Sequence, residues 1–172
     1  FFISKTTKGQ ASTLFTLKNK INVNFPVFVT STDFCFKNNN KIFRNYVKQK
    51  QSIVFTCKPT PEMKNYPNHY GWVRPNKFND IIKISCKKKI YGNSSKDQVI
   101  LGAFYFPSFS IFLEAYKKLI KEKNLVNNEY YLDVLMESIR KEKNVKMISV
   151  KKFITWGTPL EYEKYKNSNL NS

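Results

Sequence analysis

Short apolar runs rich in β-branched and aromatic residues alternate in this chain with segments of helical periodicity. Five runs have the length and composition of buried strands, at residues 26–30, 52–57, 81–86, 99–106 and 145–150. Helical spacing of apolar residues marks the segments 10–21, 107–121 and 128–141. Such alternation is typical of an α/β domain in which helices cover a mixed sheet. The sequence therefore predicts one α/β domain, residues 1–166, followed by a polar tail, residues 167–172.

The net charge of the 172-residue chain is +18, which invites a nucleic-acid function. However, the basic residues are almost all lysines spread along the chain, with arginine only at positions 44, 74 and 140. No zinc-ligand spacing, RNP-like aromatic motif or recognition-helix pattern accompanies them. We therefore expect no specific nucleic-acid partner. No apolar stretch is long enough to span a membrane, so we expect no membrane partner either. The oligomeric state is left open.

Cys35, Cys57 and Cys86 are an odd number of cysteines and lie within the predicted strands or near their ends. This pattern favours reduced thiols in a cytoplasmic protein over a disulfide framework. Only one histidine, His69, is available as a partner for them. The sequence therefore gives no support to a Cys/His metal site.

Asp33 follows the apolar run 26–30 after two polar residues, Ser31 and Thr32. In open α/β sheets, ligands bind beyond the carboxyl ends of the strands. Mg²⁺ in such sites takes one or two carboxylates together with phosphate oxygens. Asp33 is therefore a candidate metal ligand, and its alternative is a solvated residue that ends a strand. Lys87, Lys88 and Lys89 follow another run, where a solvated basic turn is the alternative to phosphate binding.

Four pairs of segments, taken in order, carry a resemblance to a known family. They are Thr-Lys-Gly-Gln-Ala-Ser-Thr at 7–13 with the strand that leads to Asp33; His-Tyr-Gly-Trp-Val at 69–73 with the strand that leads to Lys87; Gly-Ala-Phe-Tyr-Phe at 102–106 with Val-Asn-Asn-Glu-Tyr-Tyr-Leu-Asp at 126–133; and Phe-Ile-Thr-Trp-Gly-Thr-Pro at 153–159 with the helix start that follows. From about residue 7 to 165, the chain resembles sugar-1-phosphate nucleotidyltransferases, especially the branch found with capsule and surface-polysaccharide genes. Without the family, Thr158, Pro159 and Glu161 form only a helix-capping box.

This resemblance implies a Rossmann-like, GT-A-type three-layer α/β/α sandwich. The implied activity is transfer of a nucleotidyl group from a nucleoside triphosphate to a sugar 1-phosphate, with Mg²⁺ or Mn²⁺ as cofactor. The implied catalytic residues are Asp33, which would hold the metal, and Lys87, which would hold the sugar phosphate; Asp133 is a possible second metal ligand. The implied binding residues are Gly9, Gln10 and Thr32 at the nucleotide, and Gly71, Gly102 and Glu129 at the sugar. For Glu129, a structural role beside a helix cap at Asn127 or Asn128 is the alternative.

Three features depart from the family pattern. Cys86 stands where many members have Glu, and Thr155 stands where an Asp or Asn usually supplies a metal ligand. The five glycines are too dispersed to form the Gly-rich loop that cradles nucleotide phosphates. Because of this, and because the sequence begins at Phe1, we expect that the first βαβ unit is missing and that the chain alone is inactive.

Two alternatives to the nucleotidyltransferase hypothesis remain. One is a GT-A glycosyltransferase, and the other is a non-catalytic remnant that binds nucleotide sugars. A glycosyltransferase would need an Asp-x-Asp pair, and Ser31 stands where the first Asp would be.

Overall fold

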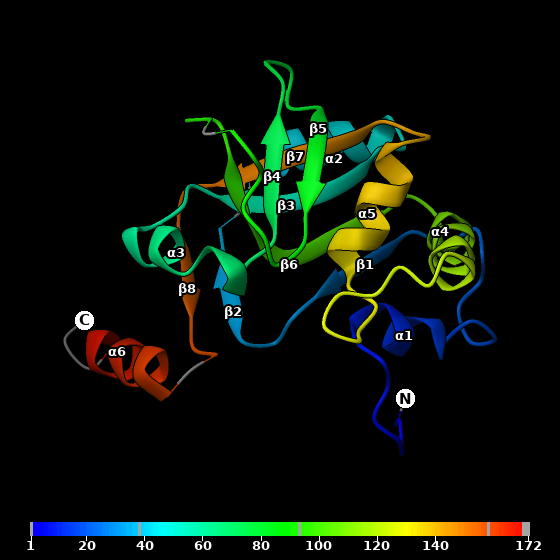
Figure 1. Cartoon of the computed structure of the whole chain (residues 1–172), viewed down its shortest axis with the longest axis horizontal. Helices are drawn as coiled ribbons and strands as arrows, with labels where there is room; N and C mark the ends of the chain where they lie inside the picture. The colour runs from blue at the N-terminus through cyan, green and yellow to red at the C-terminus, as the bar shows by residue number, and fades with distance from the viewer. Residues whose placement is uncertain (1, 38, 93, 158, 170–172) are drawn as a thin grey trace.

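The computed structural model describes residues 2–37, 39–92, 94–157 and 159–169. One mixed sheet contains six strands, in the order β5-β4-β6-β3-β7, with β1 also paired to β6 (Figure 1). Their bounds are β1 Val27–Thr30, β3 Ser52–Cys57, β4 Trp72–Pro75, β5 Ile81–Ser85, β6 Gln98–Phe106 and β7 Val145–Val150. The β3–β7 pair is parallel and the other pairs are antiparallel. All five predicted strands are present, and the prediction of a mixed sheet is confirmed.

Helices cover both faces of this sheet. On one face lie α1 (Gln10–Phe15), α4 (Phe109–Lys121) and α5 (Leu132–Arg140), and on the other lie α2 (Asn40–Lys48) and α3 (Pro61–Asn65). The central strand β3 shows the reason, because successive side chains of a strand point to opposite faces. Val54 packs into the first core, whereas Ile53 and Phe55 pack into the second. The result is the expected three-layer α/β/α arrangement.

The first helix is shorter than its periodicity predicts, since α1 ends at Phe15 and residues 16–20 form turns. Hydroxyl groups in and beside the helix bond back to its own backbone. Ser12 donates to the carbonyl of Lys8 at 3.0 Å, and Thr16 donates to the carbonyl of Thr13 at 2.7 Å. Such bonds offer the backbone an alternative to helical pairing. The prediction of a helix up to residue 21 was therefore wrong.

The predicted caps of the last core helix were also wrong. The helix α5 begins at Leu132, and its N-cap is Tyr131, which makes no side-chain capping bond. Asn127 and Asn128 instead have φ values of 49° and 63°, a left-handed conformation that Asn tolerates. They form a tight turn in which Val126 and Glu129 exchange backbone hydrogen bonds of 3.0 and 2.9 Å.

Several elements lie outside the predicted set. They are β4, α2, α3, the 3₁₀ helix η1 (Pro67–His69) and β2 (Phe34–Phe36), which forms a two-stranded antiparallel sheet with β8 (Phe153–Thr155). The last helix, α6 (Pro159–Asn169), begins where the capping box predicts and extends into the segment predicted as a polar tail. Thr158 and residues 170–172 lie outside the described residues.

An ion pair fixes the connection between β5 and β6. Arg74, on β4, donates from Nε and from a terminal nitrogen to the two carboxylate oxygens of Asp97, each at 2.7 Å. The same guanidinium donates to the carbonyls of Tyr91 and Gly92. Asp97 is buried, with 4% of its surface exposed. This bidentate contact holds the end of the connection against the sheet.

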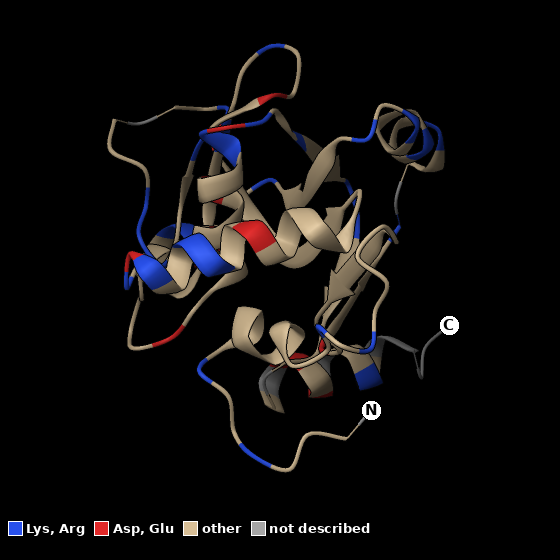
Figure 2. Ribbon diagram, turned by 90° about the vertical axis from the view of Figure 1, so that its right-hand side faces the viewer, with Lys and Arg blue, Asp and Glu red and all other residues tan. Residues whose placement is uncertain are grey.

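The other lysines and arginines are distributed over several helices and loops (Figure 2). Within the described part of the chain, no helix is long and apolar enough to cross a membrane.

Candidate functional site

A break in strand pairing locates the candidate site. The strand β6 is bordered by β3 along one edge, whereas its other edge is shared by β1, which pairs with residues 103–106, and β4, which pairs with residues 98–99. The backbone of Ile100 still donates to the carbonyl of Gly71 at 2.9 Å. Leu101 and Gly102 lie at the point where β1 and β4 separate. Gly102 has φ 79°, and the β3–β6 register shifts beside it, as in a β-bulge.

A cleft of about 400 Å³ opens at this point. A volume of this order suits a small-molecule ligand, for which pockets of roughly 300 to 1,000 Å³ are usual. Six of the residues that the sequence singled out line it together: Gln10, Asp33, Gly71, Lys87, Gly102 and Asp133. They come from segments far apart in the chain, and the fold alone brings them together.

Asp33 is held in place by the segment that follows β8. The backbone N–H of Trp156 donates to the carbonyl of Asp33 at 2.9 Å, and its indole N–H donates to the carbonyl of Thr32 at 3.1 Å. The hydroxyl of Ser31 donates to one carboxylate oxygen of Asp33. The other carboxylate oxygen lies close over Gly157, where a Cβ would be 2.7 Å from it. The carboxylate therefore reaches the cleft from a loop fixed on two sides.

Lys87 follows β5 and enters the cleft from a turn. Its φ of 52° lies in the left-handed region. Its Nζ donates to the carbonyl of His69 at 2.7 Å and lies 5.7 Å from the ring centroid of Tyr131. An ammonium group has three donors, so the bond to His69 leaves further donors for a ligand. Lys87 is therefore placed to bind an anion.

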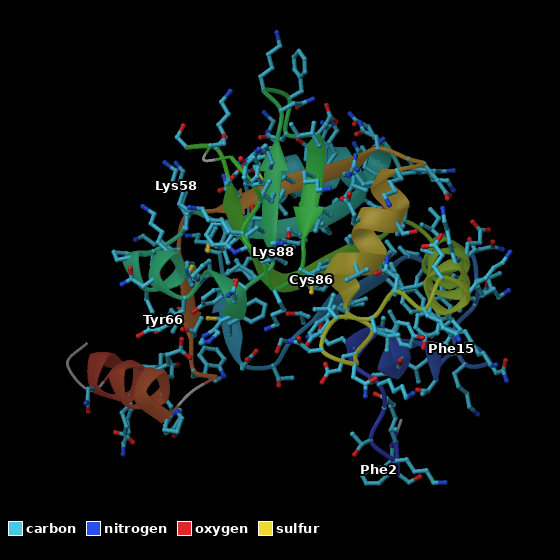
Figure 3. All side chains as sticks on the ribbon, viewed as in Figure 1. Phe2, Phe15, Lys58, Tyr66, Cys86 and Lys88 are labelled. Atoms are coloured by element: carbon cyan, nitrogen blue, oxygen red, sulfur yellow. The ribbon has the colours of Figure 1, made fainter. Side chains whose placement is uncertain are left out.

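Asp133, in the first turn of α5, is the buried carboxylate of the cleft, with 9% of its surface exposed. Burial raises the pKa of Asp133 to about 6, against the opposing effects of the Lys87 charge and of a hydrogen bond with Cys86. Burial also raises the pKa of the Cys86 thiol to about 12, and the neighbouring Asp133 charge adds to this rise. Figure 3 shows Cys86 at the end of β5, beside α5. The thiol is therefore a neutral donor to the carboxylate.

Three residues of the predicted site lie outside this cleft. Thr32 lines an adjoining cleft of about 460 Å³, to which Gln10 and Gly102 also contribute. Gly9 packs against the turn before α5, where its Cβ position would be 3.0 Å from the Cβ of Glu129. Glu129 is exposed there and is not among the residues that line the cleft. Gly9 and Glu129 thus lie against each other at the start of α1, outside the cleft.

Glu161 and Tyr131 are among the further cleft residues that the sequence did not assign to the site. Glu161, in the first turn of α6, accepts a hydrogen bond of 2.8 Å from the hydroxyl of Thr155, and both side chains line the cleft. The Trp-Gly-Thr-Pro segment was the available signal, because it places α6 beside Asp33. Within the described ranges, no group of three or more His, Cys, Asp or Glu residues is arranged to hold a metal ion.

Comparison with known proteins gives structural relatives only. No protein-family model and no curated protein sequence matches the chain. A nucleoside-diphosphate-sugar pyrophosphorylase from Vibrio cholerae is similar, with a TM-score of 0.74 and 20% identity over 96% of this chain and 67% of its own. A UDP-glucose pyrophosphorylase complexed with UDP-glucose has a TM-score of 0.76 and 19% identity, over 97% and 64%.

An inositol-1-phosphate CTP transferase from T. maritima is more distant, with a TM-score of 0.59 and 14% identity over 92% of this chain and 60% of its own. The chain thus spans between 60 and 67% of the length of these three structures. Likeness at such low identity establishes the fold, and it confirms the predicted fold class of a nucleotidyltransferase-like α/β/α sandwich.

Proposed function

We propose that this protein is a nucleotidyltransferase that transfers a nucleotidyl group from a nucleoside triphosphate to a sugar 1-phosphate and releases pyrophosphate. The observation that carries the proposal is the convergence of Asp33, Gly71, Lys87 and Gly102 on the cleft where β1 and β4 separate. The family resemblance of the sequence independently implies that these residues share one site. The shared fold with solved sugar-nucleotide pyrophosphorylases supports the same reaction class.

Each side chain has a role that its position supports. Lys87 would bind the phosphate of the sugar phosphate, because it is cationic and has donors that are not used by His69. Gln10 and Thr32 would contact the nucleotide from the adjoining cleft that Gln10 shares. Gly9 would act indirectly, by setting where α1 begins. Gly102, at the bulge, would let the ligand approach the backbone of β6.

The proposed reaction needs charge neutralisation more than it needs a protein nucleophile. An oxygen of the sugar phosphate attacks the α-phosphorus and forms a new P–O bond. The bond from the α-phosphorus to the bridging oxygen breaks, and pyrophosphate leaves with its electron pair. The attacking oxygen is already anionic, so no proton has to be removed. Positioning and cationic groups such as Lys87 would therefore supply most of the acceleration.

Asp33 fits the role of a Mg²⁺ or Mn²⁺ ligand. Its carboxylate is exposed to the cleft, and oxygen is the ligand atom that these hard cations prefer. Glu161 lines the same cleft near Thr155, the position at which related enzymes usually have a carboxylate or an amide. When bound, the cation would neutralise negative charge on the phosphates. Phosphate oxygens and water would complete its ligand set.

We further propose that turnover belongs to the full-length enzyme and that these 172 residues alone bind ligand without it, because their five dispersed glycines cannot form a phosphate-cradling loop. The capsule-branch resemblance supports a role in surface-polysaccharide synthesis. A glycosyltransferase is less well supported, because Ser31-Thr32-Asp33 lacks the Asp-x-Asp pair.

Titration of the chain with UDP-glucose and Mg²⁺, followed by calorimetry and by amide NMR shifts, tests the proposal. We expect binding that shifts the amides of Gly71 and Gly102. The variant Lys87→Ala should weaken glucose 1-phosphate binding by about 10-fold or more, the usual worth of a charge-assisted contact. A matched control is Lys77→Ala, outside the cleft. A folded chain that binds neither UDP-glucose nor any other nucleotide sugar or nucleoside triphosphate would exclude the proposed function.

A further inference from the structure

The chain buries two aspartates that have different surroundings. Asp97 lies away from the cleft and is satisfied by the guanidinium of Arg74 through two bonds of 2.7 Å. Asp133 lies on the cleft floor, and its hydrogen-bond partners are the thiol of Cys86 and its own backbone amide. A thiol is a weak donor, whereas an ionised carboxylate has about four acceptor positions. Asp133 therefore keeps acceptor capacity on the side that faces the cleft.

Stability does not account for an aspartate at this position. Apart from Ser138, the other buried residues of α5 are apolar, namely Leu132, Leu135, Met136 and Ile139. An apolar side chain at position 133 would extend this face without the cost of removing a carboxylate from water. Moreover, the carboxylate requires a glycine at position 71, because a Cβ there would overlap its Oδ2. The carboxylate at the floor of the cleft thus depends on two positions, aspartate at 133 and glycine at 71.

The surroundings also argue against a metal at Asp133. The ammonium of Lys87 acts on this carboxyl and lowers its pKa by its positive field. A cation bound at Asp133 would be repelled by the same ammonium. A neutral group with O–H donors meets no such repulsion, and its hydroxyls match the unused acceptor positions.

We infer that Asp133 determines sugar specificity by accepting hydrogen bonds from hydroxyl groups of the bound sugar phosphate, while Lys87 binds its phosphate. This inference rests on the proposed function and assigns the ligand chemistry of the same cleft. The ligand class is a sugar or polyol that carries both an anionic group and adjacent hydroxyls. Cys86 carries no carboxylate of its own, so Asp133 supplies the carboxylate beside the end of β5.

Titration calorimetry with two probes, glucose 1-phosphate and inorganic phosphate, tests the inference. In the isosteric variant Asp133→Asn, glucose 1-phosphate should bind about 10- to 100-fold more weakly, because charged acceptors are lost to the hydroxyls. Inorganic phosphate should bind equally well or better, since a negative charge beside Lys87 has been removed. The matched control is Asp80→Asn, which removes a carboxylate that does not line the cleft.

A rescue variant distinguishes recognition from structural support. In Asp133→Ala, the additional change Cys86→Glu should recover part of the lost affinity for glucose 1-phosphate, because residue 86 contacts the place of the missing carboxylate. Unchanged glucose 1-phosphate affinity in Asp133→Asn, or equal loss of both probes, overturns the inference. The proposed function fails separately, if the unsubstituted chain binds no nucleotide sugar and no nucleoside triphosphate.

Discussion

The carboxylate of Asp133 occupies the space in which a side chain at Gly71 would begin. A Cβ built on Gly71 would overlap Oδ2 of Asp133 and lie 2.8 Å from its Cγ and 2.9 Å from Cδ1 of Ile100. The family resemblance implied that this glycine lets a sugar approach the backbone. In the structure, the close approach is made by the protein itself, since α5 presses its carboxylate against the start of β4.

Gly71→Ala should therefore destabilise the fold. The new methyl group meets Asp133 and Ile100, which are both buried, so we expect a loss of about 1 to 3 kcal/mol, as for other overpacked positions. Urea denaturation measures it. Adding Asp133→Ala should restore part of the loss, because it removes the atoms that clash. A double variant no more stable than Gly71→Ala would show that the contact with Asp133 is not the cause.

Asp33→Ala should remove the metal dependence of ligand binding. For the unsubstituted chain, we expect Mg²⁺ to strengthen UDP-glucose binding, because a carboxylate and phosphate oxygens together hold the cation. For Asp33→Ala, calorimetry with and without EDTA should give the same affinity. Asp80→Asn, which does not line the cleft, should respond to Mg²⁺ like the unsubstituted chain. Retained Mg²⁺ dependence in Asp33→Ala would remove Asp33 from the metal site.

Asp133 should lower the free energy of unfolding as the pH rises, which is the opposite of the usual effect of an aspartate. Burial raises its pKa from 3.8 to about 6, so the folded state holds the proton more tightly than the unfolded state. Its contribution to stability is therefore fully present below about pH 4 and is lost as the pH rises through 6. Relative to the unsubstituted chain, Asp133→Asn should gain on the order of 1 to 3 kcal/mol between pH 4 and 7.

The variant Asp80→Asn is the control, because Asp80 should change the free energy of unfolding with pH in the opposite direction. Burial acts to raise the pKa of Asp80, but hydrogen bonds from Lys146, Asn144 and Asn76 lower it overall. Its contribution is thus present above the ordinary pKa and is lost as the pH falls through the lowered value. Urea denaturation at several pH values measures both variants. A pH-independent difference between Asp133→Asn and the unsubstituted chain would contradict the assignment.

Breaking the Arg74–Asp97 pair should cost more stability than breaking an exposed pair. Arg74→Ala leaves the Asp97 carboxylate buried without its bidentate partner and frees the carbonyls of Tyr91 and Gly92. Lys118→Ala, which removes an exposed ion pair with Glu142, is the matched control. The urea midpoint should fall further for Arg74→Ala. Equal midpoints would mean that the pair does not hold the connection before β6.

The strands were more predictable than the helices, because their signal is local. The runs that became β3, β6 and β7 are apolar on both faces, as a sheet covered by helices requires. By contrast, α2 lies in a stretch rich in Lys and Asn. Its start depends on Asn39, whose side chain accepts from the backbone N–H groups of Lys41 and Ile42. Because Lys and Asn are so frequent in this stretch, neither the N-cap at Asn39 nor the apolar face of α2 stood out in the sequence.

The candidate site was predicted as a set of residues but not as a geometry. Asp33, Gly71, Lys87 and Gly102 line one cleft, as the resemblance implied. Glu129 was predicted to bind the sugar and Asp133 to be a possible second metal ligand, both within the helical segment predicted at 128–141. The left-handed turn at Asn127 and Asn128 places Glu129 outside the helix and leaves only Asp133 in the cleft. Whether a turn or a helix forms at two adjacent asparagines depends on tertiary contacts, here the backbone bonds of Tyr130 and Ala11.

The anchoring of Asp33 by Trp156 has a consequence for synthesis on the ribosome. The two residues that Trp156 holds, Thr32 and Asp33, emerge early, whereas Trp156 follows Thr32 by 124 positions. Contacts between such distant positions form late, because a long loop must first be closed. Lys87 and Asp133 emerge in between, so the sheet and its helices can assemble before the acidic loop is fixed. The Asp33 side of the cleft is therefore completed only after Trp156 has been synthesised.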